Sequence, residues 1–326
     1  MTPFGILTRS PPTPTAHRGG ETRKHLLNFP MTIPQPIPYQ GSKRGIAARI
    51  LEFFPGKVNR LVEPFAGSAA LSLAVASRQG AKRFWLNDAH KPLMDLWTAI
   101  IESPEELAES YRLLWHDQLG REKEYFSQVR ERFNRLHVPA DFLYLLARCV
   151  KAAIRYNSRG EFNNTPDNRR KGARPEEMRN RLIAASSLFK QRIRLTSKDY
   201  LEVLDECTPN DLVYMDPPYQ GVCRNRDQRY CPPFDHSVFC RAIEKLNSRN
   251  IRFIISYDGR TGDKVYGEPI AAGYRLTRLE ILAGRSAQAT LLGRREDTIE
   301  SLYLSPNLSA LTQSRPRKHV QRLLLQ

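Results

Sequence analysis

The sequence predicts an α/β protein with a mostly parallel sheet and a helical insert. Short apolar runs alternate with segments of helical spacing on both sides of the chain's middle stretch. This alternation is typical of parallel strands joined by crossover helices. The middle stretch itself, residues 91–177, shows helical spacing and no run of the buried-strand kind. A third observation is Asp216-Pro217-Pro218-Tyr219, which directly follows an apolar run.

The individual elements follow from the same patterns. We expect strands at the apolar runs, over residues 61–65, 84–88, 193–196, 212–215, 252–256 and 299–304. Helices between strands are expected over residues 69–78 and 236–247. Within the insert, helical spacing begins near Pro104 and continues over residues 125–136 and 141–154. The α/β domain is therefore expected to comprise residues 31–90 and 178–305, interrupted by the insert.

Both ends of the chain lie outside this pattern. Residues 1–30 are rich in Pro, Thr, Arg and Gly without an apolar period, so we expect a disordered extension. Met31 stands directly before the first patterned residues and is our candidate for the natural start. Residues 306–326 carry several basic side chains and are expected to form a basic tail.

The composition is strongly basic. Lys and Arg number 51 against 34 Asp and Glu, which gives a net charge of +17. A globular protein this basic usually binds a polyanion, with nucleic acid the default, although a generally Arg-rich proteome is an alternative cause. The five cysteines form no Cys-x-x-Cys pair, which suits reduced thiols in the cytoplasm. No apolar stretch approaches about 18 residues, so we expect no membrane span.

Asp216 to Tyr219 place a distinctive set of groups at the end of a strand. Two consecutive prolines cannot continue a hydrogen-bonded ladder, so the chain must leave the sheet there. A carboxylate, a rigid carbonyl and an aromatic ring then meet at the carboxyl edge, where open α/β sheets bind ligands. Two acceptors beside a stacking ring suit a grip on the exocyclic amine of a flat base.

The stretch from Glu63 to Ala70 predicts a nucleotide-type binding turn. It runs from a strand through a tight turn of small residues into a helix, and Gly67 lets a ligand approach the backbone. Small residues also occur simply to pack a helix onto a sheet. Asp88 ends the next strand and can accept hydrogen bonds from ribose hydroxyls, or alternatively cap the following helix. No full GxGxxG or GKS/T motif is present, which disfavours a dinucleotide or ATP.

Five elements in a fixed order resemble one known family. They are Tyr39-Gln40-Gly41-Ser42-Lys43, Glu63-Pro64-Phe65-Ala66-Gly67, Asp88, the segment from Arg155 to Asn163, and Asp216-Pro217-Pro218-Tyr219. Together they are similar to the Dam-like (D12 class) adenine-N6 DNA methyltransferases, over about residues 37–305. The resemblance implies a Rossmann-like, S-adenosylmethionine-dependent methyltransferase sheet. It makes the α/β domain the catalytic domain and residues 91–177 a helical target-recognition insert.

The resemblance also implies a pocket for S-adenosylmethionine. The residues it assigns to this cofactor are Tyr39, Gly41, Lys43, Glu63, Phe65, Ala66, Gly67, Asp88, Asp199 and Tyr200. Lys43 would lie beside the cofactor's carboxylate, Asp88 would hold the ribose, and Asp199 would bond the adenine. A turn or helix cap is the alternative role for Asp199.

The resemblance makes Asp216, Pro217, Pro218 and Tyr219 the catalytic set. If the Asp216 carboxylate and the Pro217 carbonyl accept the two N–H bonds of adenine N6, the lone pair of N6 can aim at the methyl sulfonium. Transfer is then a displacement driven by positioning and charge placement. Tyr219 would stack on the adenine, which must first be flipped out of the duplex.

The end of the insert holds the densest basic run of the chain. The residues expected to contact DNA are Lys151, Arg155, Asn157, Arg159, Arg169, Arg170 and Lys171. Phosphate contacts position a protein on DNA, whereas a bidentate Arg at a guanine edge would specify the sequence. A solvated basic loop is the alternative.

Two positions depart from the family pattern. Ala69 stands where relatives often carry a second Gly. Dam proteins that mark GATC usually carry Asn-Gly just before the Arg-Tyr-Asn element, where this chain reads Val-Lys-Ala-Ala-Ile over residues 150–154. We therefore do not transfer the GATC target to this chain, and its recognition sequence is left unassigned.

The same residues bear on other possible functions. Cys223, Cys231, His236 and Cys240 could bind zinc, but their spacing matches no common zinc finger, so we expect no metal. An RNA or protein-amide methyltransferase on the same fold is an alternative, although protein-glutamine enzymes usually carry Asn in place of Asp216. A DNA-binding protein without catalysis is disfavoured because the catalytic set is intact.

The expected partner is duplex DNA, bound by a monomer in the cytoplasm of a prokaryotic or phage-infected cell. A cognate restriction endonuclease is a further candidate partner. A restriction-modification role, a phage role and a solitary role all stay open at this point.

Overall fold

The computed structural model describes residues 33–218, 234–262, 264–265, 269–270, 272–285, 297–312 and 320–323. The expected extension over residues 1–30, the candidate start Met31, and Tyr219, Cys223 and Cys231 all lie outside these residues. Within the described part of the chain, no helix combines the length and apolar character needed to cross a membrane. The three cysteines described there, Cys149, Cys207 and Cys240, are buried free thiols.

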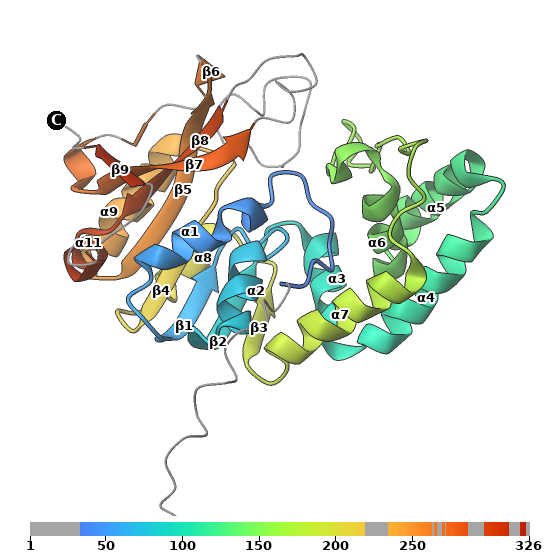
Figure 1. Cartoon of the computed structure of the whole chain (residues 1–326), viewed down its shortest axis with the longest axis horizontal. Coiled ribbons are helices and arrows are strands. Elements are labelled where there is room, and N and C mark those ends of the chain that lie inside the picture. Colours follow the sequence, from blue (N-terminus) through green and yellow to red (C-terminus); the bar gives the residue numbers. More distant parts are fainter. Residues whose placement is uncertain are drawn as a thin grey trace, which may run out of the picture. The chain divides into compact units, whose positions relative to one another are not determined.

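A nine-stranded sheet carries the fold (Figure 1). Its strands are β1 (Val58–Glu63), β2 (Ala81–Asn87), β3 (Ile193–Thr196), β4 (Asp211–Met215), β5 (Arg252–Thr261), β6 (Lys264–Val265), β7 (Thr277–Arg285), β8 (Asp297–Leu304) and β9 (Val320–Leu323). The order is β3-β2-β1-β4-β5-β8-β7-β9, with β6 paired to β5. The first five strands in this order are parallel, and β8, β7 and β9 add antiparallel pairs. The α/β prediction is confirmed.

The direction of winding reverses at β1. The chain runs from β1 to β2 and β3 on one side, then returns to β4 and β5 on the other. β1 and β4 are parallel neighbours, with Leu61 opposite Leu212. Their connections therefore leave toward opposite sides, and such a reversal point is where open α/β sheets bind ligands.

Helices cover both faces of the parallel strands. Successive strand residues point to opposite faces, so Leu61 joins one buried cluster and Val62 the other. The first face packs against α1 (Ala47–Ile50), α2 (Ala70–Ser77) and the helices of the middle stretch. The second packs against α8 (Tyr200–Asp205) and α9 (His236–Ser248). Burial on both faces explains why these strands are nearly continuous apolar runs.

The middle stretch is helical, as expected, but it does not form a separate compact unit. Its helices are α3 (Lys91–Glu102), α4 (Pro104–Asp117), α5 (Glu122–Leu136), α6 (Pro139–Arg148) and α7 (Pro175–Phe189). α7 packs against both α3 and α4, so the helical layer continues past the expected boundary at residue 177. One apolar cluster runs from Leu86 in the sheet to Phe126 and Phe133 in α5. Figure 1 shows these helices gathered beyond the β3 edge.

Several boundaries differ from the sequence prediction. β5 runs five residues further than the predicted 252–256, and β7 and β9 were not predicted. Leu279, Glu280 and Ile281 of β7 are all buried, but polar and charged residues interrupt its sequence, so it lacks the apolar run that marked the other strands. The expected basic tail from residue 306 instead contains α11 (Pro306–Thr312) and β9, and Leu308 of α11 is fully buried.

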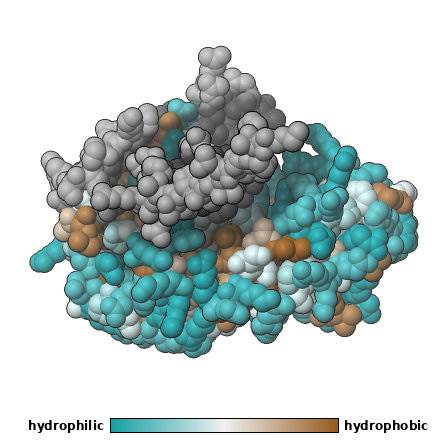
Figure 2. Space-filling view, turned by 60° about the horizontal axis from the view of Figure 1, so that its bottom comes forward, coloured by the Kyte–Doolittle hydropathy of each residue, from teal (hydrophilic) through white to brown (hydrophobic). Residues whose placement is uncertain are grey.

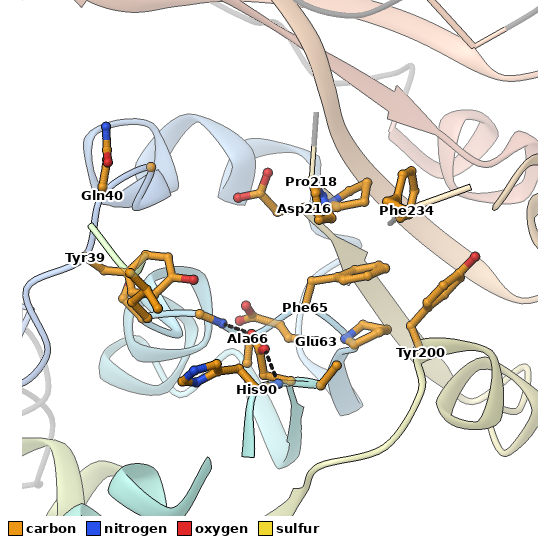
Figure 3. Close-up of a pocket in the computed structure, with 18 of the residues that line it drawn as sticks. Tyr39, Gln40, Glu63, Phe65, Ala66, His90, Tyr200, Asp216, Pro218 and Phe234 are labelled. Atoms are coloured by element: carbon orange, nitrogen blue, oxygen red, sulfur yellow. Dashed lines mark hydrogen bonds between the residues drawn. The ribbon is translucent and has the colours of Figure 1, made fainter. Parts of the chain in front are cut away.

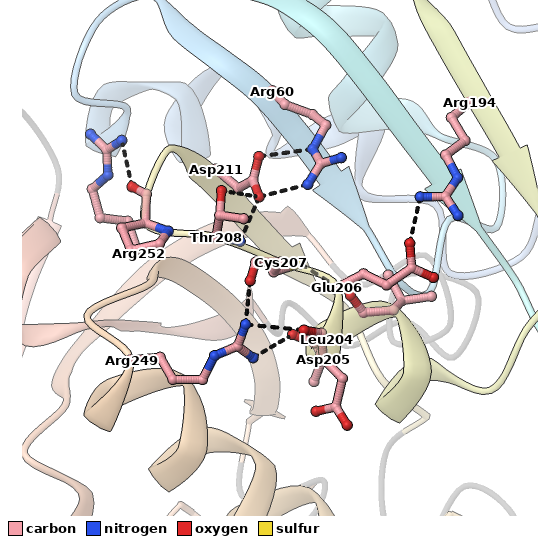
Figure 4. A network of polar contacts seen from close by, with 12 residues as sticks. Arg60, Arg194, Leu204, Asp205, Glu206, Cys207, Thr208, Asp211, Arg249 and Arg252 are labelled. Carbon is pink, nitrogen blue, oxygen red and sulfur yellow. Dashed lines mark hydrogen bonds and ion pairs between the residues drawn. The ribbon is translucent and has the colours of Figure 1, made fainter.

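A polar network ties the loop before β4 to its neighbours at the amino edge of the sheet (Figure 4). The Arg60 guanidinium donates to both oxygens of Asp211, at 2.8 and 2.7 Å. Thr208 donates to Asp211 Oδ2 through its backbone N–H at 2.7 Å and its hydroxyl at 3.0 Å. The Asp211 side chain is only 2% exposed, so these donors replace the water that a carboxylate would otherwise require.

Asp211→Ala is expected to lower the free energy of unfolding by about 3–5 kcal/mol, because it leaves Arg60 without its buried partner. Glu206→Ala is a matched control, because Glu206 pairs with Arg194 at 2.7 Å and with Lys198 at 2.8 Å in a far more exposed setting. Exposed pairs contribute less than about 1 kcal/mol. Urea unfolding of both variants measures the difference, and equal effects would contradict the importance assigned to Asp211.

Candidate active site

A cavity of about 720 Å³ opens at the carboxyl ends of β1 and β4, where the winding reverses (Figure 3). It is lined by predicted residues from every motif of the sequence analysis. These are Tyr39, Gly41, Lys43, Glu63, Phe65, Ala66, Gly67, Asp88, Asn157, Asp199, Tyr200, Asp216, Pro217 and Pro218. The sequence motifs, far apart along the chain, thus meet in one place.

The turn after β1 is held open by a backbone contact. Gly67 has a φ of 49° and donates its N–H to Asp88 Oδ2 at 3.0 Å. A Cβ at Gly67 would lie 3.2 Å from the Tyr39 ring, so the tyrosine closes directly over the turn. Ala69 also adopts a left-handed conformation, with a φ of 48°, in the position where relatives often carry Gly.

Asp88 braces this turn rather than capping the next helix. Its second oxygen, Oδ1, accepts the His90 N–H at 3.0 Å. His90 is itself the cap of α3, because its Nδ1 accepts from Leu93 N at 3.1 Å. The helix-cap alternative for Asp88 is therefore wrong. Burial raises the pKa of Asp88, and its two backbone hydrogen bonds oppose that shift.

Glu63 connects β1 to the helix that follows the turn. Its carboxyl is 2% exposed and accepts the Ser72 N–H at 2.7 Å, in the first turn of α2. A helix N-terminus favours negative charge. Burial raises the pKa of Glu63 to about 7, and the bond from Ser72 opposes the rise. Glu63 therefore positions the turn as well as lining the cavity.

Aromatic rings form one wall of the cavity. Phe65 and Tyr200 lie with their ring centroids 5.0 Å apart, and Phe234 lies 6.2 Å from Phe65 (Figure 3). Asp199 caps α8, since Oδ1 accepts the Leu201 N–H at 2.8 Å, which confirms the cap alternative. A carboxylate has two oxygens, so capping by Oδ1 is compatible with a ligand contact at the other.

Phe234 lines the cavity but was not among the predicted site residues. It is the first described residue after Pro218 and lies two residues before the start of α9, with no motif of its own. His90 was also missed, although it lines the cavity and hydrogen-bonds the Tyr156 hydroxyl. Burial lowers the pKa of His90 to about 4, so the imidazole is neutral at pH 7.

Three charged side chains meet where β4 ends. The Lys43 ammonium lies 3.4 Å from Asp216 Oδ1 and 3.0 Å from Glu300 Oε2. Burial alone would lower the pKa of Lys43, but the two carboxylates outweigh it and raise the value. Lys43 was predicted to lie beside the cofactor's carboxylate, and in the structure its ammonium lies beside two carboxylates of the chain itself.

Asp216 follows β4 directly and is partly buried, with 22% of its side chain exposed. Burial raises the pKa of Asp216 to about 6, Lys43 lowers it and Glu300 adds to the rise. Pro217 and Pro218 then take the chain out of the sheet, as the sequence predicted. At pH 7 the Asp216 carboxyl is mostly ionised and can accept hydrogen bonds.

The residues expected to contact DNA are only partly brought together. Asn157 lines the cavity, and its Oδ1 accepts from the backbone N–H groups of Arg159 and Glu161 at 2.9 and 3.0 Å. The remaining members are exposed outside it: Lys151, Arg155, Arg159, Arg169, Arg170 and Lys171. Lys171 pairs with Glu122 at 2.9 Å.

The cluster considered for zinc is only half described. His236 and Cys240 lie one turn apart on α9, with Cys240 Sγ 3.7 Å from His236 Nδ1. Cys223 and Cys231 lie outside the described residues. No group of three metal-ligating side chains occurs in the part of the chain that the structure describes.

The sequence of the chain was compared with known protein families and proteins. Residues 39–268 match the model of the D12 class N6 adenine-specific DNA methyltransferases. Type II methyltransferase M1.LlaDCHI of Lactococcus lactis subsp. cremoris is 29% identical over 56% of this chain and 64% of that protein. Type II methyltransferase M.MjaIII of Methanocaldococcus jannaschii is 27% identical over 69% of this chain and 84% of that protein.

The DNA N-6-adenine-methyltransferase of Escherichia phage P1 is 26% identical over 63% of this chain. That match covers 26% of the phage protein, and the Lactococcus match covers just under two thirds of its protein. The family match over residues 39–268 includes the residues that line the cavity.

Gly67→Ala is expected to destabilise the protein more than Gly41→Ala does. Both glycines have a positive φ, at 49° and 86°, which costs an L-residue about 1–2 kcal/mol. Only at Gly67 would the new methyl group also press on the Tyr39 ring, since nothing lies within 4 Å of a Cβ at Gly41. Urea unfolding of both variants measures the extra loss. A loss no greater for Gly67→Ala would show that Tyr39 moves aside freely.

Proposed function

Because the chain belongs to the D12 class N6 adenine-specific DNA methyltransferase family, we propose that it methylates the N6 amine of adenine in duplex DNA at a specific sequence. The observation that carries the proposal is the shared cavity. Asp216 and Pro217, at the end of β4, face the same space as the Gly67 turn after β1. A methyl donor and an amine acceptor can therefore be held side by side.

The cavity residues fit S-adenosylmethionine as the donor. When bound, this cofactor supplies a methyl group on a positively charged sulfur. Gly67, closed over by Tyr39, leaves a cradle that a side chain would fill. Phe65 and Tyr200 offer an apolar wall for an adenine ring, and Asp88 and Asp199 offer acceptors for hydroxyl and amine groups.

Asp216 and Pro217 are the proposed hydrogen-bond acceptors for the target amine. The ionised Asp216 carboxylate accepts one N–H of adenine N6, and the Pro217 carbonyl accepts the other. Both acceptors are held on a strand end, so they orient the amine without rearrangement. Because N6 is paired and stacked within a duplex, the proposal includes flipping the adenine out of the helix, with Tyr219 stacking on it.

The exposed basic residues of the insert are the proposed DNA contacts. Arg169 and Arg170 follow the cavity-lining segment in sequence and are exposed, so a phosphate backbone can reach them. Figure 2 shows a largely hydrophilic face, which suits a polyanionic partner better than an apolar one. We further propose that the protein acts as a monomer on one strand at a time.

A restriction endonuclease is a candidate partner, supported by relatives that are named type II methyltransferases.

Methyl transfer to DNA is tested with S-adenosylmethionine labelled in its methyl group. Incubation with duplex DNA, RNA and protein should label only the DNA, and nucleoside analysis should identify N6-methyladenine. Asp216→Ala should lower kcat by at least about 100-fold, because it removes an acceptor that acts in the transition state. DNA affinity should stay within a few-fold.

Asp205→Ala is the matched control for this assay, since Asp205 is an exposed carboxylate paired with Lys245 away from the cavity. It should leave kcat unchanged. Label on RNA or protein but not on duplex DNA would overturn the proposed substrate, and full activity of Asp216→Ala would overturn the assigned role.

Replacing both Arg169 and Arg170 by Ala should weaken DNA binding about equally for all sequences, because phosphate contacts carry no sequence information. The slope of log affinity against log salt should fall by about two units. Replacing Lys82 and Arg83, exposed basic residues on β2, is the matched control and should change neither quantity. Fluorescence anisotropy at several salt concentrations measures both, and equal slopes in the two double variants would contradict the proposed interface.

A further inference from the structure

β8 delivers a carboxylate to the cavity from the antiparallel half of the sheet. β4 ends at Met215, opposite Ile255, but β5 continues to Thr261 and β8 pairs along this extension. Glu300 of β8 stands opposite Gly259, beyond the level at which β4 ends. It therefore lies over the carboxyl edge of the parallel strands, where Asp216 and Lys43 are.

The local backbone is specialised for this placement. The β5–β8 register shifts between Ser256 and Gly259, and Asp258 within the bulge has a φ of 56°. Gly259 has a φ of 151°, and a Cβ there would lie 2.6 Å from the Ile299 carbonyl oxygen. Only glycine fits so close to the strand that carries Glu300.

The Lys43 ammonium contacts two carboxylates at similar distances. Lys43 Nζ is 3.0 Å from Glu300 Oε2 and 3.4 Å from Asp216 Oδ1. All three side chains are largely buried, with exposed fractions of 10% for Lys43, 22% for Asp216 and 17% for Glu300. Charges act on one another more strongly in such surroundings than in water. Among these three described side chains, one cation lies beside two carboxylates.

We propose that Glu300 is a positioning residue for the methyl transfer. It holds the Lys43 ammonium so that this cation does not fully neutralise Asp216. Asp216 then remains a strong acceptor for the N–H of the target amine, because an acceptor with excess negative charge forms the stronger hydrogen bond. This inference rests on the proposed function of Asp216, and it adds a residue that none of the sequence motifs contains.

The charged groups around Asp216 give the sign of the effect. Burial is the largest influence and raises the pKa of Asp216, Lys43 lowers it, and Glu300 raises it. Glu63, on β1, also interacts with Asp216, and Tyr214, on β4, interacts with Lys43. Removing the Glu300 charge leaves Lys43 to pair with Asp216 and removes a repulsive negative charge, so the pKa of Asp216 should fall. Removing the Lys43 charge should raise it.

The first test is the pH dependence of kcat. In Glu300→Gln, the acid limb of the profile should move to lower pH while kcat on its plateau falls several-fold and KM for DNA changes little. In Lys43→Met, the limb should move to higher pH. Glu280→Gln is the matched control, because Glu280 is a buried carboxylate on β7 bonded to Arg260 at 2.8 and 3.0 Å. Its acid limb should coincide with that of the unmodified protein.

The second test needs no substrate or cofactor. Because the pKa of Asp216 is about 6 in the folded protein, above its ordinary 3.8, the native state binds the proton more tightly than the unfolded state. Ionisation of Asp216 therefore reduces stability as pH rises from about 4 to 6. Asp216→Asn removes this loss, so its stability relative to the unmodified protein should rise across that window. With Glu300→Gln as background, the rise should be smaller.

Urea unfolding at several pH values measures this difference in the ligand-free protein. An acid limb of Glu300→Gln that is unmoved or shifted to higher pH would overturn the inference. An equal rise for Asp216→Asn with and without Glu300→Gln would overturn it as well. If the protein transferred no methyl group to DNA, the proposed function would fail, but the unfolding test would still decide whether Glu300 controls Asp216.

Discussion

The position of β1 between two parallel neighbours is the constraint on which the site depends. β1 pairs with β2 on one side and β4 on the other, in registers that bring all three carboxyl ends to one edge. The Gly67 turn follows β1, Asp88 follows β2 and Asp216 follows β4, so each group reaches the cavity from a different strand. A shift of one residue in either register would turn the strand's side chains to the opposite face. Packing of both faces therefore fixes the geometry of the cavity.

The two edges of the sheet each hold a buried carboxylate, but the partners of these carboxylates differ. At the amino edge, Asp211 receives four hydrogen bonds from Arg60 and Thr208, which satisfy its charge with donors in fixed positions. At the carboxyl edge, Asp216 shares its cation with Glu300. Burying charges costs several kcal/mol per ion unless partners compensate. The first arrangement stabilises the fold, whereas the second keeps negative charge available beside the cavity.

Sequence patterns predicted the parallel strands and most of the cavity because their signals are local. Strands buried on both faces appear as apolar runs, and the end of β4 is marked by two prolines. The strand that carries Glu300 was predicted over residues 299–304, but the role of Glu300 had no local signal, since its contact with Lys43 spans 257 positions of sequence. The β5 extension that carries the bulge also lies beyond the apolar run that marked the strand. Long-range pairing, absent from any local pattern, places this residue.

The turn at Lys151 and Ala152 lies in the stretch where Dam proteins that mark GATC usually carry Asn-Gly. Both residues are left-handed, with φ of 60° and 49°, which is the conformation that an Asn-Gly pair favours. L-residues adopt it at a cost of about 1–2 kcal/mol each, so tertiary contacts must hold the turn. Gln40 N donates to the Ala152 carbonyl at 3.0 Å, and Asn164 Nδ2 donates to that of Ala153 at 2.6 Å. These contacts hold the left-handed turn in place, and the Gln40 bond joins the Tyr39 segment to the end of the helical insert.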